Sequence, residues 1–188
     1  SEVMHQYEKI NGLYQLLSGN RKNSRMDIET YVQRHYLEQI LEAANQRFQD
    51  MSAGQFELRM CDIDKAGTGK NRGLDLMVYS AVTGKVREVR TLSGGESFMA
   101  ALSLALGMAD QIQESSAAIN LDMMFIDEGF GSLDEHSRDQ AVKVLQNMAE
   151  GEKLIGIISH VTELKQEIED QLIVTKDDQG SHTRWQIS

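Results

Sequence analysis

The sequence predicts an α/β fold, because helical and extended patterns alternate along its second half. Two runs of strand length, 121–126 and 154–158, are almost wholly apolar, as strands buried in parallel sheets are. A polar segment of helical length, 135–149, separates them, and the order strand, helix, strand is typical of parallel α/β domains. The chain also has no proline in its 188 residues, a composition that suits long helices.

Composition and charge exclude several classes of protein. A chain of 188 residues with 40% hydrophobic side chains suits one domain with a core that needs no disulfide or structural metal. Its net charge of −10 argues against a protein that holds DNA by itself. The single Cys61 cannot form an internal disulfide, and the five histidines lack zinc-ligand spacing. Since we find no membrane-span or signal-peptide pattern, we expect a cytoplasmic protein with no membrane partner.

Two helices are predicted at the start of the chain. From residue 3 to about 20, apolar residues recur at helical spacing among polar neighbours, which predicts an exposed amphipathic helix. After a polar break at 19–24, either Ser24 or Asp27 is a candidate cap for a second helix that ends before Gly54. The apolar residues of the first helix are Ile10, Leu13, Leu16 and Leu17.

The pattern then changes to the alternation of strands. Apolar and polar residues alternate at 56–60 and again at 74–78, and a turn at Thr83–Gly84 leads to a third strand at 86–89. Residues 97–112 are apolar almost all round, so we expect an interior helix.

The end of the chain predicts a short helix after residue 160 and two strands that meet at 177–180. Residues 64–71 resemble a phosphate-binding loop but fail its pattern, because Asp64 stands in place of a glycine and Asn71 in place of a hydroxyl residue. The segment also joins two strands, and we interpret it as a hairpin loop.

Two short segments carry candidate chemistry. Gly94 and Gly95 precede the apolar helix, so their backbone amides lie where a helix dipole favours an anion, and Ser93 adds a hydroxyl. The alternative is an ordinary glycine-rich loop. Further on, Asp127 and Glu128 end an apolar strand, where the first carboxylate can hold a magnesium ion and the second can orient or deprotonate a water molecule.

Two later residues extend this pattern, although each has a plain structural alternative. Asp134 begins the predicted polar helix in the sequence Ser-Leu-Asp, as an ordinary helix cap does. His160 follows the last buried strand, where an imidazole can donate to a phosphate oxygen or can be merely structural.

The order of these motifs resembles the C-terminal half of an ABC-type ATPase head. LSGGE matches the signature motif, FIDE matches Walker B with its catalytic glutamate, SLD matches the D-loop and Ser-His matches the H-loop. Gly129 follows the acids where transporter members place proline, so the chain is most similar to the SbcC-type branch of DNA-repair ATPases. The segment 36–58 also resembles the return of that family's coiled coil to its head. The resemblance divides the chain into a coiled-coil base at 1–50 and an ATPase lobe at 51–188.

The resemblance implies ATP and Mg²⁺ as cofactors and assigns a role to each motif. Asp127 corresponds to the magnesium ligand, Glu128 to the residue that positions the attacking water, and His160 to the γ-phosphate sensor. Asp134 corresponds to the acid at the dimer seam. The residues that close over ATP held by another subunit are Ser93, Gly94, Gly95 and Glu96.

The resemblance also implies partners. The family's Walker A and Q-loop motifs are missing from the sequence given, so we expect an N-terminal Walker A lobe of the same full-length protein. Other expected partners are a second head, a metallophosphoesterase-type nuclease subunit that is SbcD-like, and double-stranded DNA. The chain alone is expected to be inactive. The alternatives are an SMC-like chromosome tether without a nuclease, a transporter ATPase that Gly129 disfavours, and a module with accidental motifs.

A cluster of cations lies between positions 65 and 90, against the acidic balance of the chain. We interpret it either as a solvated hairpin face or as a surface that contacts DNA phosphates. Its members are Lys65, Lys70, Arg72, Lys85, Arg87 and Arg90.

Overall fold

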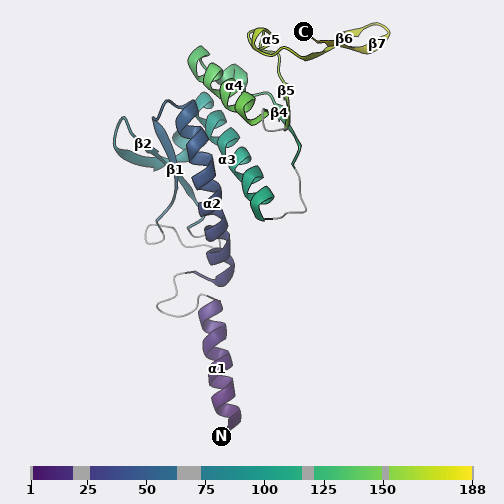
Figure 1. The fold of residues 1–188 in the computed structure, drawn as a ribbon. Helices are drawn as coiled ribbons and strands as arrows, with labels where there is room; N and C mark the ends of the chain where they lie inside the picture. Colours follow the sequence, from purple (N-terminus) through teal and green to yellow (C-terminus); the bar gives the residue numbers. More distant parts are fainter. Residues whose placement is uncertain (1, 19–25, 63–72, 116–120, 150–152, 188) are drawn as a thin grey trace. The chain divides into compact units, whose positions relative to one another are not determined.

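The chain forms two compact units, residues 1–120 and 121–188, and each is described here by itself (Figure 1). Both units contain helices and strands, which confirms the α/β prediction. The predicted boundary at residue 50 divides the chain by expected role rather than by packing, and it stays a prediction. The computed structural model describes residues 2–18, 26–62, 73–115, 121–149 and 153–187.

The elements follow in nearly the predicted order. The first unit contains α1 (Glu2–Leu17), α2 (Ile28–Met51), β1 (Phe56–Met60), β2 (Leu76–Ser80), β3 (Lys85–Glu88) and α3 (Gly94–Ser115). The second contains β4 (Met123–Asp127), α4 (Glu135–Ala149), β5 (Leu154–Ile158), α5 (Leu164–Glu167), β6 (Gln171–Asp177) and β7 (Gly180–Gln186). Short 3-10 turns at Val89–Thr91 and Phe130–Ser132 precede α3 and α4. The candidate phosphate loop at 64–71 lies outside the described residues, but β1 and β2 on either side of it pair antiparallel, as a hairpin requires.

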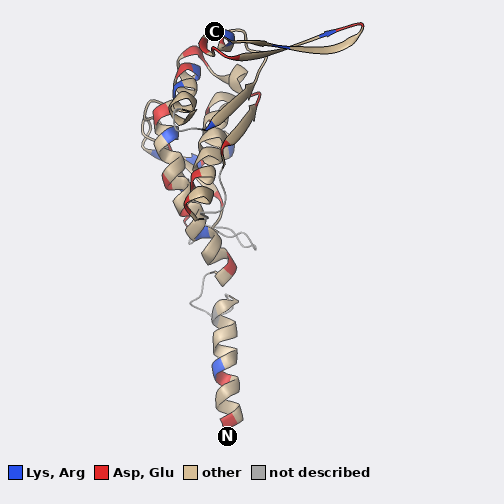
Figure 2. Ribbon diagram, turned by 45° about the vertical axis from the view of Figure 1, so that its right-hand side comes forward, with Lys and Arg blue, Asp and Glu red and all other residues tan. Residues whose placement is uncertain are grey.

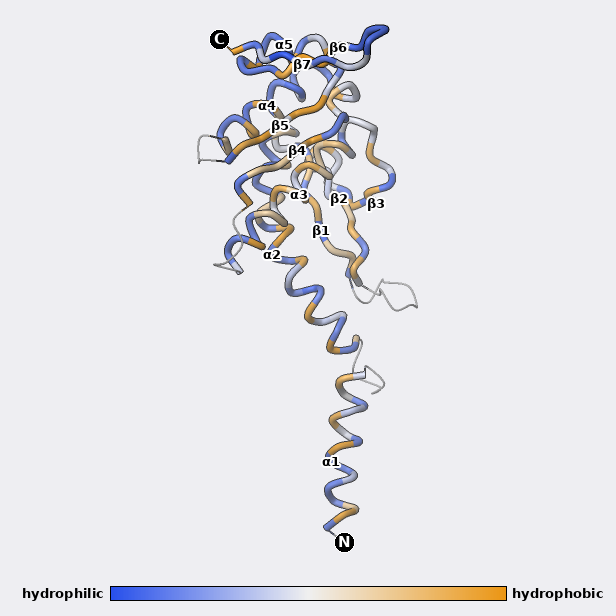
Figure 3. Tube along the Cα trace, turned by 90° about the vertical axis from the view of Figure 1, so that its right-hand side faces the viewer, coloured by the Kyte–Doolittle hydropathy of each residue, from blue (hydrophilic) through white to orange (hydrophobic). Residues whose placement is uncertain are grey.

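The first helix, α1, carries an exposed apolar stripe along its length. Its apolar side chains recur at intervals of four and three residues, which is the spacing of a coiled-coil seam (Figure 3). The helix therefore offers a face on which a second helix can pack. The stripe consists of Val3, Tyr7, Ile10, Tyr14 and Leu17, all of them exposed.

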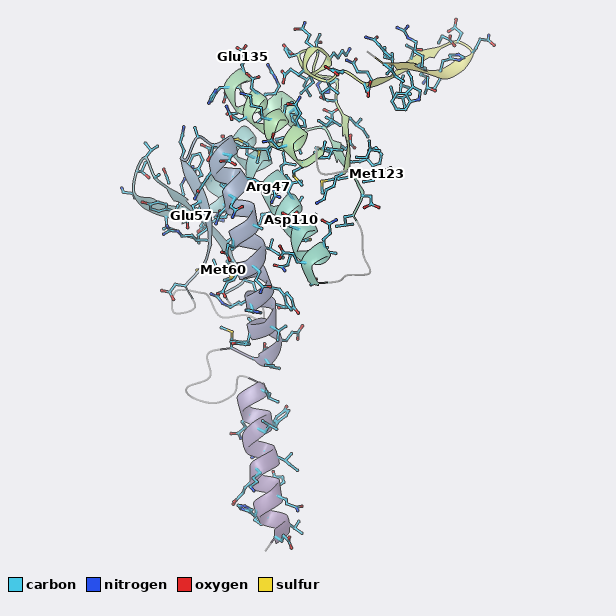
Figure 4. All side chains as sticks on the ribbon, viewed as in Figure 1. Arg47, Glu57, Met60, Asp110, Met123 and Glu135 are labelled. Atoms are coloured by element: carbon cyan, nitrogen blue, oxygen red, sulfur yellow. The ribbon has the colours of Figure 1, made fainter. Side chains whose placement is uncertain are left out.

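Helix α2 begins at the cap that the sequence offered. The backbone amide of Thr30 donates to Oδ1 of Asp27 over 2.7 Å, so Asp27 is the N-cap residue. Further along, α2 packs beside α3, and Arg47 and Asp110 point toward each other between the two helices (Figure 4). Their Nη2 and Oδ2 atoms are 2.5 Å apart.

The first unit has its core between α2, α3 and an antiparallel sheet of order β1-β2-β3. The sheet places Phe56, Leu58 and Val78 on its buried face. The outer face is polar and carries Arg59 with its guanidinium 4.2 Å from the centre of the Tyr79 ring. The helices contribute Phe48, Met51 and Leu106 to the same core.

One side chain of α2 completes the edge of the sheet. Nδ2 of Asn45 donates to the carbonyl of Leu58 over 2.9 Å, and the amide of Leu58 donates to Oδ1 of Asn45 over 2.7 Å. Because β1 is an edge strand, these two bonds satisfy backbone groups that a neighbouring strand otherwise satisfies. Asn45 therefore fixes the position of α2 along the strand.

The prediction that the helix at 97–112 is interior all round is wrong. Met99, Leu102 and Leu106 are buried, whereas Ala101 and Met108 lie on an exposed side of α3. The physical reason is that α2 and the sheet pack against one face of α3 and leave the opposite face uncovered in this unit. No helix among the described residues is long and apolar enough to cross a membrane.

The second unit is built on two parallel strands, β4 and β5, with α4 as the helix that connects them. Helix α4 buries Ala141, Val142 and Leu145. The unit continues through α5 into an antiparallel hairpin formed by β6 and β7, as predicted.

The prediction that β4 and β5 are buried on both faces is wrong for one of them. The register pairs Met123 with Leu154, so alternate residues of the two strands share a face, and that face is exposed. A pattern of apolar residues indicates suitability for burial, and the second unit covers the two strands on one side only. The exposed face consists of Met123, Phe125, Leu154 and Ile158.

Candidate functional site

The signature segment forms the start of α3 as a reciprocal capping box. The backbone amide of Ser93 donates to Oε2 of Glu96 over 2.8 Å, and the amide of Glu96 donates to Oγ of Ser93 over 3.3 Å. The helix begins at Gly94, so the amides of Gly94 and Gly95 belong to its first turn. Such amides are the donors with which a helix N-terminus receives an anion.

A residue that the sequence analysis grouped with the basic cluster also reaches this segment. Arg87 on β3 donates through Nη1 to the carbonyl of Thr91 over 2.5 Å and to its Oγ1 over 2.9 Å. Its Nη2 lies 3.4 Å from Oε2 of Glu96. The strand alternation, which pairs Arg87 with the buried Val78, was the signal that could have placed it on this side of the sheet.

The rest of the basic cluster does not form one described surface. Lys65, Lys70 and Arg72 lie outside the described residues. Arg90 forms an ion pair with Glu88 on its own segment. Figure 2 shows Lys and Arg interspersed with Asp and Glu along the helices, rather than gathered in one place. The hypothesis of a DNA-contacting patch stays a prediction.

The acidic pair lies at the carboxyl end of β4, as the sequence predicted. Asp127 is the last residue of the strand. Glu128 has a φ of 60°, a left-handed conformation that is rare outside glycine and is typical of strained functional positions. Its backbone amide donates to the carbonyl of Ile158 over 2.9 Å, which ties the acid to the end of β5. Gly129 follows with a φ of 97°, which a glycine adopts without strain.

The structure brings Glu128 and His160 together. Nδ1 of His160 lies 2.9 Å from Oε2 and 3.0 Å from Oε1 of Glu128. The two residues are 32 positions apart and meet because the parallel pairing puts the carboxyl ends of β4 and β5 side by side. The His160 side chain is 80% exposed and that of Glu128 is 50% exposed, so a ligand can reach both.

Asp134 caps helix α4. Its Oδ1 accepts from the amide of Ser137 and its Oδ2 accepts from the Ser137 hydroxyl, both over 2.9 Å. These bonds, the backbone one first, hold the pKa of Asp134 below its ordinary value. The structure thus supports the plain role of a helix cap, and this role is compatible with a further contact at a dimer seam.

The cap predicts a pH dependence of stability. A lowered pKa in the folded chain means that the ionised Asp134 stabilises at neutral pH, and that this contribution is lost as the pH falls through the lowered value. Asp134→Ala should therefore lower the urea midpoint at pH 7, and the gap to the wild-type chain should shrink below about pH 4. Urea denaturation at both pH values measures it. A gap that is independent of pH would contradict the charged cap.

The predicted site residues are divided between the two units. Ser93, Gly94, Gly95 and Glu96 belong to the first unit, and Asp127, Glu128, Asp134 and His160 belong to the second. Among the described residues, no three His, Cys, Asp or Glu side chains form a group that could hold a metal. Asp127 alone fits magnesium, because Mg²⁺ in nucleotide sites takes one or two carboxylates and completes its shell with phosphate oxygens and water.

The comparisons with known sequences agree with this arrangement. Residues 74–147 match the model of the SbcC/RAD50-like family described by its Walker B motif. The chain is 46% identical over 175 residues, or 93% of its length, to a protein of Treponema pallidum (strain Nichols) that is named as the SbcC component of the nuclease SbcCD. It is 44% identical over 179 residues to the protein of the same name from Vibrio cholerae. The chain spans only 16% and 18% of the length of these two relatives.

The fold is similar to that of solved SMC ATPase heads. A chain from a study of the ATP-driven dimerisation and DNA-stimulated activation of SMC ATPases superposes with a TM-score of 0.63 at 15% identity, over 83% of this chain and 88% of that one. The Smc head domain of Pyrococcus furiosus, solved with an extended coiled coil and the C-terminal domain of ScpA, gives 0.59 at 17% identity, over 83% of this chain and 36% of that one. The fold is therefore that of the C-terminal half of an ABC-type head, and the chain belongs to the SbcC/RAD50-like family.

Proposed function

We propose that this chain is the C-terminal ATPase lobe of an SbcC-like subunit in an ATP-dependent complex that cuts double-stranded DNA during repair and recombination. The observation that carries the proposal is the meeting of Glu128 and His160 at 2.9 Å, directly after the strand that ends in Asp127. A carboxylate and an imidazole at the carboxyl ends of adjacent parallel strands are the groups that hydrolysis of a phosphate ester or anhydride needs.

The residues of the second unit divide the work of hydrolysis. Asp127 holds Mg²⁺ directly or through water, and the bound ion supplies charge neutralisation at the phosphates. Glu128 orients the attacking water or accepts its proton. His160, which reaches Glu128 through Nδ1, has its other ring nitrogen available to donate to the γ-phosphate.

The signature segment acts on a different nucleotide. The amides of Gly94 and Gly95 and the hydroxyl of Ser93 lie at a helix N-terminus, where they favour a phosphate. In the proposed assembly this phosphate belongs to ATP held by a second copy of the head, and Asp134 lies at the seam between the copies. ATP binding then joins two heads, and hydrolysis releases them and gates the nuclease.

The partners follow from the same proposal. The exposed face of β4 and β5 supports an N-terminal Walker A lobe from the same full-length protein, because parallel strands are normally covered on both faces. The names of the relatives support an SbcD-like nuclease partner of the metallophosphoesterase type, and a cytoplasmic complex that acts on double-stranded DNA.

The similarity to SMC heads favours one second candidate, a chromosome tether that shares the motifs and has no nuclease. Purification of the full-length protein from its own cells separates the two functions. A metallophosphoesterase-type nuclease in stoichiometric amount supports the first, and its absence under conditions that preserve the head dimer supports the tether.

Reconstitution of the two lobes tests the ATPase itself. The chain is mixed with its Walker A lobe, and ATP hydrolysis is compared with that of each part alone. We expect activity only in the mixture, because the chain supplies Asp127, Glu128 and His160 while the other lobe supplies the loop that cradles the phosphates. A folded and associated mixture that does not hydrolyse ATP would contradict the proposal and reduce the acids to ordinary strand ends.

A further inference from the structure

Arg87 lies on the side of the sheet that faces the core of the first unit. In the register it is paired with Val78, which is fully buried, and its guanidinium carbon is 5.6 Å from the centre of the Phe56 ring. The Arg87 side chain is 33% exposed. Its stem is therefore packed, and its charged end is directed at the segment that leads into α3.

The guanidinium holds both ends of that segment. Nη1 donates to the carbonyl and to the hydroxyl of Thr91, and Nη2 pairs with Oε2 of Glu96 over 3.4 Å. The Thr91 hydroxyl in turn donates to the carbonyl of Glu88 over 2.6 Å. One side chain thus connects the end of β3 with the first turn of α3.

The contact with Glu96 continues to the signature serine. Oε2 of Glu96, the atom nearest Arg87, is also the atom that accepts from the amide of Ser93 over 2.8 Å. Ser93 accepts in return from the amide of Glu96. The position of Ser93 therefore depends on the Glu96 carboxylate, and the position of that carboxylate depends on Arg87.

Charge gives Arg87 a second effect. An ionised Glu96 stands in the turn whose amides are available to an anion, and a negative charge there opposes the binding of a phosphate. The guanidinium offsets this charge from the side of the sheet, where it leaves the loop uncovered.

From these contacts we propose that Arg87 is a positioning residue of the signature segment: it holds Glu96 in the capping box and offsets its charge, so that Ser93 and the two glycines can receive a phosphate. This inference rests on the proposed function, since it names a residue that acts through the same site. The other hypothesis, that Arg87 contacts DNA, is disfavoured because both of its terminal nitrogens are already engaged within the first unit.

Four variants of the full-length protein test the proposal. Arg87→Met keeps the packed stem and removes the charge, and Arg87→Lys keeps the charge but not the two-armed geometry. The double variant Arg87→Met with Glu96→Gln removes the opposing charge as well, while glutamine can still complete the capping box. Lys85→Met is the matched control, because Lys85 lies on the same strand and the same face two residues away.

The first readout is ATP-dependent dimerisation of the heads without DNA. Loss of a partly exposed ion pair changes affinity about 2- to 5-fold, and two signature segments act in one dimer, so Arg87→Met should weaken dimerisation about 4- to 25-fold. Arg87→Lys should lie between this variant and the wild type. The double variant should recover most of the loss, and Lys85→Met should match the wild type. Equal behaviour of Arg87→Met and Lys85→Met, or no recovery in the double variant, would overturn the proposal.

The second readout needs no nucleotide, which separates the failure of this inference from the failure of the proposed function. Hydrogen exchange of the Ser93 amide should become several times faster in Arg87→Met than in Lys85→Met, because the carboxylate that accepts from it is no longer held. Unchanged exchange overturns the inference even if the wild type is an ATPase. Faster exchange in a wild-type background that never hydrolyses ATP leaves the positioning role intact and removes only the function we assign to the segment.

Discussion

Glu128→Gln should lower ATP hydrolysis by the assembled heads about 10²- to 10⁴-fold, the usual effect of removing a general base. Glutamine has nearly the same shape as glutamate, and its amide oxygen can still accept from Nδ1 of His160, so the geometry at the ends of β4 and β5 should persist. ATP binding does not need this base. The variant should therefore bind ATP, form the head dimer and remain dimeric, which steady-state hydrolysis and size-exclusion chromatography with ATP measure together.

The matched control for this variant is Glu169→Gln. Glu169 is an exposed glutamate of the same unit, so the substitution makes the same change of charge away from the strand ends. It should leave both hydrolysis and dimerisation at wild-type levels. If Glu128→Gln hydrolyses ATP as fast as Glu169→Gln does, then Glu128 is a structural residue and its left-handed backbone needs another explanation.

The sequence predicted the second unit well because clear boundary residues enclose its elements. Helix α4 and strand β5 lie at the predicted residues 135–149 and 154–158, since a capping residue starts the helix and a strongly apolar run defines the strand. Strand β2 begins two residues later than predicted, where alternation alone had to define its start. The exposed faces of α3 and β4 could not be predicted, because an apolar pattern does not say which part of a protein covers it.

The same contrast holds for the site. The order of the motifs identified Asp127, Glu128 and His160, whereas the contact between Glu128 and His160 depends on the pairing of two strands and is a property of the fold. Arg87 was counted as one cation of a cluster, since charge alone does not reveal a partner. Its two-residue alternation with Lys85 was visible in the sequence, but which face met the core became clear only from the register with Val78.

Gly107→Leu should disrupt the first unit, because α2 and α3 approach each other most closely at this position. A Cβ atom added at Gly107 lies 2.7 Å from the carbonyl oxygen of Ile40 and 2.9 Å from the amide nitrogen of Ala44, and neither backbone atom can turn away as a side chain can. The helices must move apart to admit any side chain. Forced overpacking costs about 1 to 3 kcal/mol and occasionally more, and we expect the leucine variant at or above the upper end.

The alanine variants at Gly107 and Gly12 decide whether packing or helix propensity dominates. Replacing a helical glycine by alanine favours the helix by about 1 kcal/mol. At Gly12 on α1 an added Cβ meets no described atom within 4 Å, so Gly12→Ala should raise helix content without loss of stability. At Gly107 the clash exceeds this gain, and Gly107→Ala should lower the melting temperature by roughly 2 to 8 °C, for a net loss of about 1 to 2 kcal/mol. Circular dichroism during thermal unfolding measures both variants. If Gly107→Ala is as stable as the wild type, then α2 and α3 do not make this close contact and the core of the first unit is packed differently.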